Sequence, residues 1–492
     1  MRELSELLER LDYRILQGKI EGDITDLVYD SRKATAGCLF VCIPGTSVDG
    51  HTFAAPVADI GAKAIIVEHE VDVRSDVTVL QVRDSRAALA QLSAAYFDDP
   101  SEKLSVIGIT GTKGKTTTTY MIKSILENAG HKVGLIGTIE AIIGDEHIPA
   151  ANTTPESYVV EEYFSKMVAA GLDTCVMEVS SQGLMMHRVD GVKFELGIFT
   201  NIEPDHIGPG EHADFDDYLN CKKKLFKKCK KGLFNADDPH LEDILEGATC
   251  EVETFGFAKD ADFRAENMEL WKDGGSLGVK YDVAGKESFP VRIHVPGRFS
   301  VYNSLSAIAV CHHFGVEAQD MQKALAAARV KGRIEMIPVS DNYSLMIDYA
   351  HNAMSLKSLL TTIREYEPAR LVCLFGCGGN RSKLRRYEMG EVSGNLADLT
   401  IITSDNPRFE EPMDIISDIK FGINKTSGDY VEIPDRKDAI KYAIENGQPG
   451  DVIVLAGKGH EDYQEIKGKK YPMDERVLIR EVLEELGREV RF

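Results

Sequence analysis

The sequence of 492 residues contains no apolar stretch of about 18 residues or more, so we expect no helix that crosses a bilayer. Its amino terminus, MRELSELLERLDY, is charged and amphipathic and lacks the apolar core of a signal peptide. The nine cysteines include no C-x-x-C pair, which argues against structural zinc and is typical of reduced thiols. We therefore expect a cytoplasmic protein without stable membrane insertion.

The sequence also has no excess of basic over acidic residues. The formal net charge is -22, because 79 Asp and Glu residues outweigh 57 Lys and Arg residues. This charge argues against a general nucleic-acid binder or a protein of anionic membrane surfaces. One basic cluster, KKKLFKKCKK at 222–231, stands against the acidic background, and most of its lysines are expected on a solvated helix face.

The most informative segment is VIGITGTKGKTTTT at 106–119, where an apolar strand leads through a glycine loop into a helical pattern. Gly111 and Gly114 would let backbone N–H groups approach phosphate oxygens. Lys115 could reach the β- and γ-phosphates, and the hydroxyl of Thr116 or Thr117 could bind Mg²⁺. The alternative is a glycine turn with a surface lysine, which the strand–loop–helix context disfavours. The segment therefore predicts ATP binding, although Ile109 stands where the usual phosphate-loop spacing has its first glycine.

The chain is long enough for about three domains. Residues 1–98 read as a small α/β domain and residues 99–332 as a nucleotide domain with a mostly parallel sheet, with polar antiparallel strands inserted near 252–295. Residues 333–492 show a second series of alternating strands and helices. The predicted fold is α/β with three domains, a central P-loop-type sheet domain and a Rossmann-like C-terminal domain. GCGGN at 376–380 lacks the full G-x-G-x-x-G pattern, so an NAD site is a weak interpretation.

Polar residues follow several predicted strands, at the sheet edge where open α/β folds bind ligands. In the last domain, Arg408 in SDNPR and Glu461 in GKGHED follow two such strands. A guanidinium can hold a carboxylate through two hydrogen bonds. An ammonium would suit Glu461 or Asp405, so this domain is predicted to bind an amino acid.

The ordered motifs GITGTKGKTTT, NTTP, MEVSS, DH, YLNCKKKLF, PGRFSVYN, GRIE, DYAH, FGCGGNRSK, SDNPR and GKGHEDYQ span the chain. They resemble the Mur ligase family, the ATP-dependent amide-forming enzymes of peptidoglycan synthesis. The resemblance is greatest to the branch that joins a diamino acid to UDP-N-acetylmuramoyl-L-alanyl-D-glutamate. It implies a monomer that uses ATP and Mg²⁺.

The resemblance assigns roles to matching residues, which fall into four sets. The ATP set is Gly111, Thr112, Lys113, Gly114, Lys115, Thr116, Thr117, Asn303, Arg333, Asp348 and His351. The set for the UDP-muramoyl dipeptide is Ser31, His51, Thr153, Thr154, Ser180 and Arg188. The amino-acid set is Arg386, Asp405, Asn406, Arg408, Gly457 and Glu461. The magnesium set is Thr117, Glu178, His206 and Lys222, the last as a carbamate formed with CO₂ (N6-carboxylysine), and the catalytic residues are Lys115, Glu178, His206 and Lys222.

The implied reaction has two steps. The D-glutamyl carboxylate attacks the γ-phosphate of ATP to give an acyl phosphate, and the amine of the diamino acid then displaces phosphate. The amino acid is expected to be meso-2,6-diaminopimelate, because Arg408 would bind a distal carboxylate that lysine lacks. L-Lysine is the competing candidate, because DHIGPGEH at 205–212 is closer to lysine-adding members. The sequence also leaves open a related amide ligase, such as a folylpolyglutamate synthetase, and a non-catalytic nucleotide-binding protein.

Overall fold

The computed structural model describes residues 2–45, 48–208 and 210–492. The chain divides into two compact units, which are described separately below. Unit 1 comprises Met1–Asp262 and Ser306–Val316, and unit 2 comprises Phe263–Leu305 and Glu317–Phe492. Among the helices of the described residues, none has the length and apolar character needed to cross a bilayer.

Unit 1 begins with a five-stranded sheet that is parallel except for its first edge strand. In spatial order its strands are β2 (Arg14–Gln17), β7 (Thr78–Gln81), β6 (Ala64–Val67), β5 (Leu39–Val41) and β4 (Leu27–Val28). A short pair, β1 (Arg2–Glu3) and β3 (Asp23–Ile24), accompanies it. The helices of this part are α1 (Leu4–Leu7), α2 (Ala54–Ile60) and α3 (Ser85–Tyr96).

The larger sheet of unit 1 follows the glycine loop and has a parallel centre. Its order is β11 (Glu146–Pro149), β10 (Glu140–Ile143), β9 (Val133–Ile136), β12 (Thr174–Glu178), β8 (Ser105–Thr110), β13 (Phe194–Phe199), β14 (Cys229–Asn235) and β15 (Glu251–Gly256). The first two strands are antiparallel to their neighbours. The helices are α4 (Lys115–Asn128), α5 (Ser157–Ala169), α6 (Ser181–Met185), α7 (Phe215–Lys223) and α8 (Leu241–Leu245).

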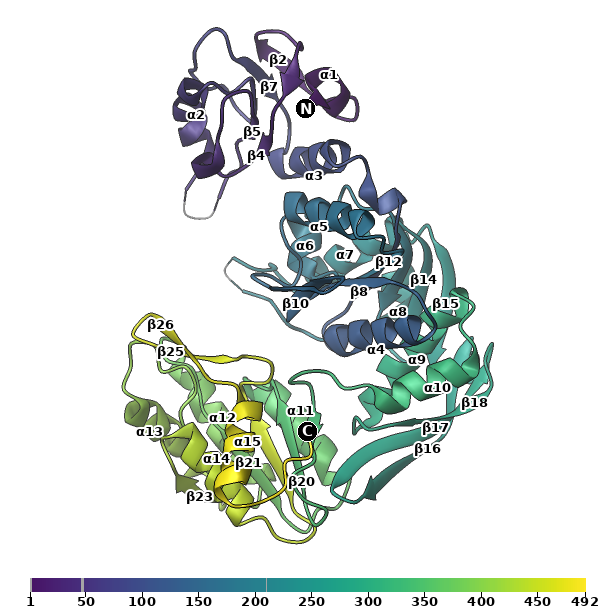
Figure 1. The fold of residues 1–492 in the computed structure, drawn as a ribbon, viewed down its shortest axis with the longest axis vertical. Helices are drawn as coiled ribbons and strands as arrows, with labels where there is room; N and C mark the ends of the chain where they lie inside the picture. The colour runs from purple at the N-terminus through teal and green to yellow at the C-terminus, as the bar shows by residue number, and fades with distance from the viewer. Residues whose placement is uncertain (1, 46–47, 209) are drawn as a thin grey trace. The chain divides into compact units, whose positions relative to one another are not determined.

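Both faces of the central strands are buried, which explains their continuous apolar sequences. Val106 and Cys175 point toward the core that holds Phe164 of α5 and Leu184 of α6. Their neighbours along the strands point to the other face, because side chains alternate along a strand, and α4 packs against β8, β9 and β12 there. Figure 1 shows α4 and α5 on opposite faces of this sheet.

Helix α3 joins the two sheets of unit 1 by packing against α5. The two helices lie so close to the loop after α6 that a Cβ added at Gly191 would lie 2.6 Å from the carbonyl oxygen of Ala90. Glu161 of α5 lies in this contact with 1% of its surface exposed, and both of its carboxyl oxygens are buried without a hydrogen-bond partner. Burial raises the pKa of Glu161 to about 8.

Unit 2 contains an antiparallel three-stranded segment and a six-stranded sheet. The segment consists of β16 (Phe263–Asp273), β17 (Ser276–Gly285) and β18 (Phe289–Ile293), and it is followed by α9 (Arg298–His313) and α10 (Ala318–Ala327). The sheet order is β19 (Glu335–Ile337), β20 (Ser344–Asp348), β24 (Val452–Ala456), β21 (Leu371–Phe375), β22 (Leu399–Ile402) and β23 (Asp429–Glu432). All pairs except β19 with β20 are parallel.

Helices cover both faces of this second sheet, as in a doubly wound fold. One face packs against α14 (Arg436–Glu445) and α15 (Glu475–Glu485). The other helices are α11 (Ala353–Arg364), α12 (Lys383–Leu396) and α13 (Pro412–Ile423), which pack in succession. A separate antiparallel hairpin consists of β25 (Tyr463–Ile466) and β26 (Lys469–Pro472) and is drawn in yellow in Figure 1.

The predicted fold class is confirmed, including the parallel central sheet and the Rossmann-like last sheet. One expectation was wrong in part, because the predicted antiparallel insertion near 252–295 includes a parallel strand. β15 pairs in parallel with β14 after the short helix α8, so it completes a strand–helix–strand unit, and only β16–β18 are antiparallel. The domain boundaries at 98 and 332 remain a prediction.

Candidate active site

The glycine loop between β8 and α4 is held against the end of the neighbouring strand β13. Gly111 has a φ of 145°, and a Cβ there would lie 1.9 Å from Thr200 Oγ1, so only glycine fits. Asn201 fixes the loop from the side, because its Oδ1 accepts from the Lys113 amide at 2.9 Å and its Nδ2 donates to the Lys113 carbonyl at 3.0 Å. Sequence analysis did not predict this role for Asn201.

Helix α4 starts at Lys115, directly after Gly114 in a left-handed conformation with φ 87°. The Lys115 ammonium donates to the carbonyl oxygens of Gly111 and Thr112 at 2.8 and 3.0 Å. The loop thus places a lysine charge and a helix amino terminus at the same point, an arrangement that binds phosphate.

Glu178 ends β12 beside this loop and is 1% exposed. Its carboxylate accepts hydrogen bonds from the Thr116 hydroxyl at 3.1 Å, from the Thr138 amide at 2.9 Å and from the Thr138 hydroxyl at 2.9 Å. The structure therefore brings Thr116 to Glu178, and it records no such contact for Thr117, whose place in the magnesium set stays a prediction. Carboxylate and hydroxyl oxygens are suitable ligands for Mg²⁺.

Lys222 of α7 points back to the same loop, although the other lysines of the basic cluster face outward. Its ammonium donates to the Gly111 carbonyl at 3.0 Å and lies 4.5 Å from the ring centre of Tyr218. It is 1% exposed and forms no ion pair with any carboxylate of residues 2–45, 48–208 and 210–492. Burial, with a contribution from the Lys115 charge, holds the pKa of Lys222 well below its usual value.

His206 lies on the segment after β13 with a left-handed φ of 55° and a side chain that is 56% exposed. Its Nδ1 is 3.3 Å from Glu211, and its ring is 6.2 Å from Tyr218. No contact with Glu178 is recorded, so its role as a metal ligand stays a prediction. His212 is buried instead, with Nδ1 3.1 Å from Asp217 and Nε2 unpartnered.

The residues predicted to hold the dipeptide substrate form a continuous network with Glu178. Thr154 Oγ1 donates to the Glu178 carbonyl at 3.0 Å and accepts from the Ser180 amide at 3.0 Å. Arg188 donates to the Thr154 carbonyl at 3.0 Å, and the Thr153 hydroxyl lies 3.1 Å from that of Thr138. The structure thus brings Thr153, Thr154, Ser180 and Arg188 together.

In the N-terminal part of unit 1, Ser31 begins a short turn of helix after Asp30. His51 is buried, and both of its ring nitrogens have hydrogen-bond partners. His51 Nε2 accepts from the Glu68 amide at 2.8 Å, so Nδ1 must carry the proton that faces Asp49 at 2.6 Å. His69 stacks on His51 and, with Asp49, completes a cluster of metal-ligand type. Because neither ring nitrogen of His51 is left as an acceptor, this cluster does not suit a metal ion.

The nucleotide residues predicted in unit 2 lie around Tyr349. Asp348 is half-buried and accepts from the amides of Ile334 and Ala350 at 2.9 and 2.8 Å, and desolvation of its carboxyl group raises its pKa. Arg333 lies 4.7 Å from the centre of the Tyr349 ring, and the ring of His351 is at the same distance. Asn303 lies within α9. Their contacts with ATP stay a prediction.

A charged cluster occupies the carboxyl ends of β22 and β24, as predicted for the amino-acid site. Its centre is Lys458, which sequence analysis missed and which is 0% exposed. The Lys458 ammonium donates to Glu461 Oε2 at 2.8 Å and to Asn406 Oδ1 at 3.1 Å, and it lies 3.5 Å from Asp405. Two carboxylates and one ammonium leave one negative charge. Gly457 is required here, because a Cβ would lie 3.3 Å from Asp405 and φ is 102°.

The ionisation of Glu461 depends on this lysine. Burial acts to raise the pKa of Glu461, but the Lys458 ammonium and the hydrogen bonds from Lys458 and Asn406 outweigh it and hold the pKa below its usual value. Glu461 is therefore a carboxylate at neutral pH. A carboxylate in this state can pair with an ammonium group.

Arg408 adopts a left-handed φ of 53° at the turn after β22. Its Nη1 donates to the Gly379 carbonyl at 2.8 Å and its Nε to Glu465 at 3.1 Å. Gly379 packs directly on this turn, since a Cβ there would lie 1.9 Å from the Pro407 carbonyl oxygen. The glycines of GCGGN are thus explained by close packing and require no dinucleotide.

Arg386, which was predicted to bind the amino acid, is 1% exposed in α12. Its Nη1 and Nη2 donate to Glu410 at 2.8 Å, and Nη1 also donates to Asp418 at 2.9 Å. This pairing holds the pKa of Glu410 at about 2. Arg381 is exposed five residues earlier, and its Cγ and Arg408 Nη1 both lie within 4 Å of a Cβ position on Gly378. Arg381 is therefore better placed for a ligand.

These two arginines are expected to respond differently to truncation. Arg386→Ala should lower the free energy of unfolding by about 2–4 kcal/mol, because it removes the buried guanidinium that pairs with both Glu410 and Asp418. Arg381→Ala should leave stability within about 0.5 kcal/mol and raise the KM for the amino acid. Urea unfolding and steady-state kinetics of both variants test the assignment, and an unchanged KM in Arg381→Ala would contradict it.

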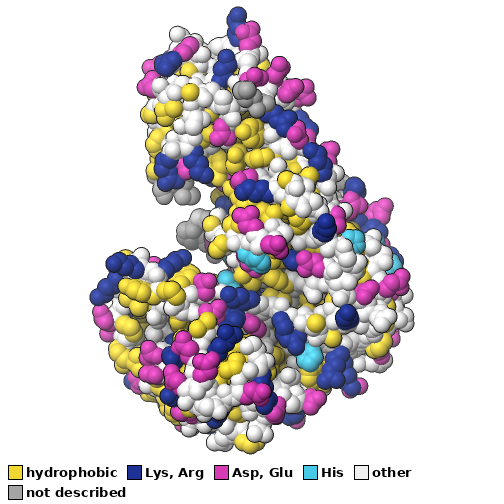
Figure 2. Space-filling view, viewed as in Figure 1, with side chains coloured by type: hydrophobic (Ala, Val, Ile, Leu, Met, Phe, Trp, Pro, Cys, Tyr) yellow, Lys and Arg dark blue, Asp and Glu magenta, His cyan; other side chains and the backbone are white. Residues whose placement is uncertain are grey.

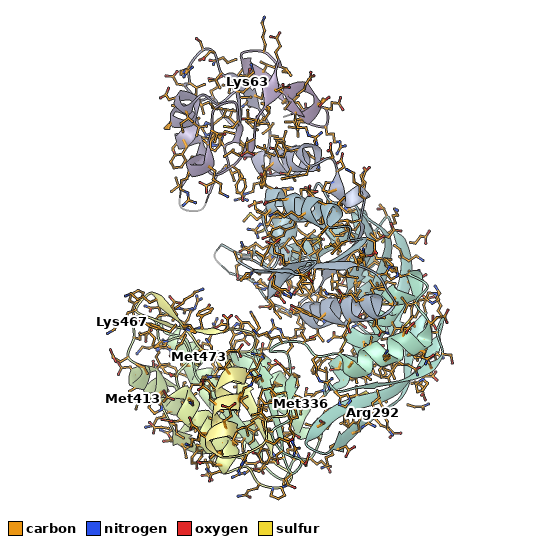
Figure 3. All side chains as sticks on the ribbon, viewed as in Figure 1. Lys63, Arg292, Met336, Met413, Lys467 and Met473 are labelled. Carbon is orange, nitrogen blue, oxygen red and sulfur yellow. The ribbon has the colours of Figure 1, made fainter. Side chains whose placement is uncertain are left out.

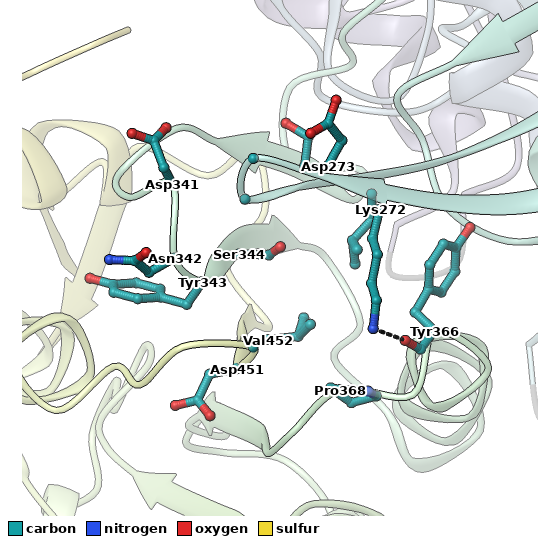
Figure 4. A pocket seen from close by; sticks show the side chains of 15 residues that line it. Lys272, Asp273, Asp341, Asn342, Tyr343, Ser344, Tyr366, Pro368, Asp451 and Val452 are labelled. Carbon is teal, nitrogen blue, oxygen red and sulfur yellow. Dashed lines mark hydrogen bonds between the residues drawn. The ribbon is translucent and has the colours of Figure 1, made fainter.

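Unit 2 has a further pocket, drawn in Figure 4, of about 190 Å³. It lies where β20 and β24 begin, at Ser344 and Val452, and is closed by the turn of the β16–β17 hairpin. Lys272 crosses it to the Tyr366 carbonyl at 3.4 Å. The predicted amino-acid residues Gly457 and Glu461 follow the carboxyl end of β24, so this pocket is at the opposite edge of the sheet from that site.

Comparison with known proteins matches three consecutive parts of the chain. Residues 23–97 match the model "Mur ligase family, catalytic domain", residues 109–311 "Mur ligase middle domain" and residues 332–459 "Mur ligase, glutamate ligase domain". A protein of Clostridium perfringens is 43% identical over 98% of this chain and 99% of its own length. The chain belongs to the Mur ligase family.

Two similar Mur ligases share one description. The C. perfringens protein and one of Clostridium tetani, 42% identical over 98% of the chain and 99% of that protein, are both named UDP-N-acetylmuramoyl-L-alanyl-D-glutamate–2,6-diaminopimelate ligase. A solved structure with that description is 27% identical, with a TM-score of 0.74 and 99% coverage of both chains. MurF from Acinetobacter baumannii shares the Mur ligase fold at 20% identity, with a TM-score of 0.63.

Proposed function

We propose that this Mur ligase adds meso-2,6-diaminopimelate to UDP-N-acetylmuramoyl-L-alanyl-D-glutamate with consumption of ATP, in peptidoglycan synthesis. The observation that carries the proposal is the amino-acid cluster of unit 2, where Arg408 stands beside a group with one unbalanced negative charge. An amino acid with a far carboxylate and an ammonium matches this arrangement. The names of relatives at about 40% identity agree with it.

The glycine loop supports the first step, transfer of the γ-phosphoryl group to the D-glutamyl carboxylate. Lys115 would offset the charge on the transferring group, and the amides at the start of α4 would hold the neighbouring phosphates. Mg²⁺, when bound, would supply further positive charge to the phosphate oxygens. Glu178 and the hydroxyl of Thr116 or Thr117 fit it, because they offer oxygen ligands beside the loop.

The second step requires an amine that is held and then released to attack the acyl phosphate. Glu461 and Asp405 would receive the ammonium form, and Arg408 would fix the distal carboxylate. Arg381 supplies a further positive group on the same loop, whereas Arg386 would support this loop through Glu410 and Asp418. Lysine would leave Arg408 without its carboxylate.

We propose further that Lys222 acts as a carbamate formed with CO₂. Only a neutral amine reacts with CO₂, and burial of Lys222 favours the neutral form. An ammonium beside a divalent cation has the wrong sign, whereas a carbamate is an additional oxygen ligand. The Lys222 side chain donates to the Gly111 carbonyl of the glycine loop, and Lys115 donates to the same carbonyl. Mass spectrometry of the native protein in bicarbonate would detect the added CO₂.

The test of the proposed function is phosphate release from ATP with the UDP-muramoyl dipeptide and one of three acceptors, meso-diaminopimelate, L-lysine or L-ornithine. Release with diaminopimelate at least about tenfold above that with lysine is expected. Release mainly with lysine would keep the family and refute the assigned amino acid. Silence with all three would favour a related ligase, such as a folylpolyglutamate synthetase. A cytoplasmic location, a monomeric state and no binding of nucleic acid remain predictions.

A further inference from the structure

The β25–β26 hairpin holds Glu465 against Arg408 through several contacts. The Arg408 amide donates to the Glu465 carbonyl at 2.9 Å, and the Glu465 amide donates to Asn406 Oδ1 at 2.9 Å. On the side chains, Arg408 Nε donates to Glu465 Oε2 at 3.1 Å. Figure 3 labels Lys467 in the turn that joins β25 and β26. The position of Glu465 is therefore fixed by backbone and side chain together.

This pair still offers one donor and one acceptor. Among the described residues, Arg408 Nη2 and Glu465 Oε1 have no hydrogen-bond partner. Both side chains are about one-quarter exposed, at 23% and 25%. One guanidinium nitrogen and one carboxylate oxygen side by side match a carbon that carries both a carboxylate and an ammonium.

We infer that Arg408 and Glu465 together bind the far amino-acid centre of the acceptor, with its carboxylate on Arg408 and its ammonium on Glu465. This inference rests on the proposed function and assigns a residue that sequence analysis did not single out. The ammonium and carboxylate of one centre share a carbon atom. When Arg408 binds the carboxylate of this centre, the ammonium on the same carbon therefore lies near Glu465, which is the partner of Arg408.

Glu461 is less suited to this ammonium. Its Oε2 already receives Lys458 and Asn406, and its Oε1 lies 3.4 Å from the Tyr349 hydroxyl. Glu465 keeps a whole oxygen unengaged. Glu461 remains available for the amine that reacts.

The pair would select for both charges at the far end of the acceptor. L-Lysine carries the far ammonium alone and leaves the guanidinium without a carboxylate. L-2-Aminopimelate carries the far carboxylate alone and leaves Glu465 without an ammonium. Since a buried or half-buried charge without its partner is costly, each should bind less well than meso-diaminopimelate.

Glu465→Gln tests this directly, because glutamine retains an oxygen for Arg408 Nε and removes only the charge. We expect the wild type to show a KM for L-2-aminopimelate at least about tenfold above that for meso-diaminopimelate. Glu465→Gln should raise the KM for diaminopimelate about tenfold and leave that for aminopimelate within about twofold. Glu432→Gln is the matched control, because Glu432 pairs with Lys420 in β23 at 2.7 Å.

A merely structural role of Glu465 would raise both KM values together, and that result would overturn the inference. An unchanged ratio of the two KM values in Glu465→Gln would overturn it as well, as would a collapse of the ratio in Glu461→Gln alone. Unchanged KM values for ATP and the dipeptide confirm that the variant is folded. A wild type that uses lysine in place of diaminopimelate refutes the proposed function itself, which is a separate result.

Discussion

Lys222→Ala is expected to lower kcat by about 10²–10³-fold, because the oxygen ligand that a Lys222 carbamate would offer to Mg²⁺ beside the phosphate loop is lost. Lys222 is the one buried lysine of its basic cluster, and its ammonium lies on the carbonyl of Gly111 in the phosphate loop. Bicarbonate should not restore the variant, since alanine has no amine to carry CO₂. The measurement is phosphate release with saturating ATP, dipeptide and diaminopimelate.

Lys230→Ala is the control for this prediction. The Lys230 side chain is 75% exposed and pairs with Glu195 on the surface, so its loss should change kcat by less than about twofold. Bicarbonate depletion provides a second arm, because it should slow the wild type and leave the residual rate of Lys222→Ala unchanged. Full activity of Lys222→Ala would refute both the carbamate and its place near the phosphate.

Glu161→Gln is expected to flatten the pH dependence of stability. The pKa of Glu161 is about 8 in the folded protein, against an ordinary value of 4.5, because the carboxyl is buried between α5 and α3. Ionisation of Glu161 therefore does not lower the free energy of unfolding below about pH 4.5. It lowers this free energy progressively as the pH rises from 4.5 towards 8. At about 1.4 kcal/mol per pKa unit, the loss reaches about 5 kcal/mol at most.

Urea unfolding at pH 5, 7 and 9 measures this difference, and hydrogen exchange of α3 and α5 amides locates it. The difference in free energy of unfolding between Glu161→Gln and the wild type should grow in favour of the variant from pH 5 to 9. Glu162→Gln is the control, since Glu162 pairs with Lys166 on the surface at 2.9 Å. Parallel pH curves for Glu161→Gln and the wild type would contradict the prediction.

The sequence predicts the elements of the site better than the contacts that complete it. Glycine spacing, apolar strands and polar strand ends are local signals, so the phosphate loop, Glu178 and the residues around β22 and β24 were found. Asn201 binds Lys113 from 88 positions away, and Thr138 binds Glu178 from 40 positions away. Neither contact has a local signal, because only the sheet order brings the segments together.

Arg386 of α12 and Arg381, two residues before this helix, show the same limit. Both are arginines near the start of α12, and composition alone does not show which of them faces Glu410 and Asp418. The buried Lys458 is a similar case, since a lysine in GKGHED reads as a surface residue until its three acceptors are known. Whether a charged side chain is buried or exposed can be predicted only when the positions of its partners in the fold are known.

The order of strands in the last sheet also matters during biosynthesis. β24 lies between β20 and β21, although it is made about a hundred residues after β20. A ribosome-bound chain that ends before Val452 therefore exposes the apolar edges of both earlier strands. Gly457, Lys458 and Glu461 directly follow this strand, so the proposed amino-acid site also forms only after β24 has been made and inserted.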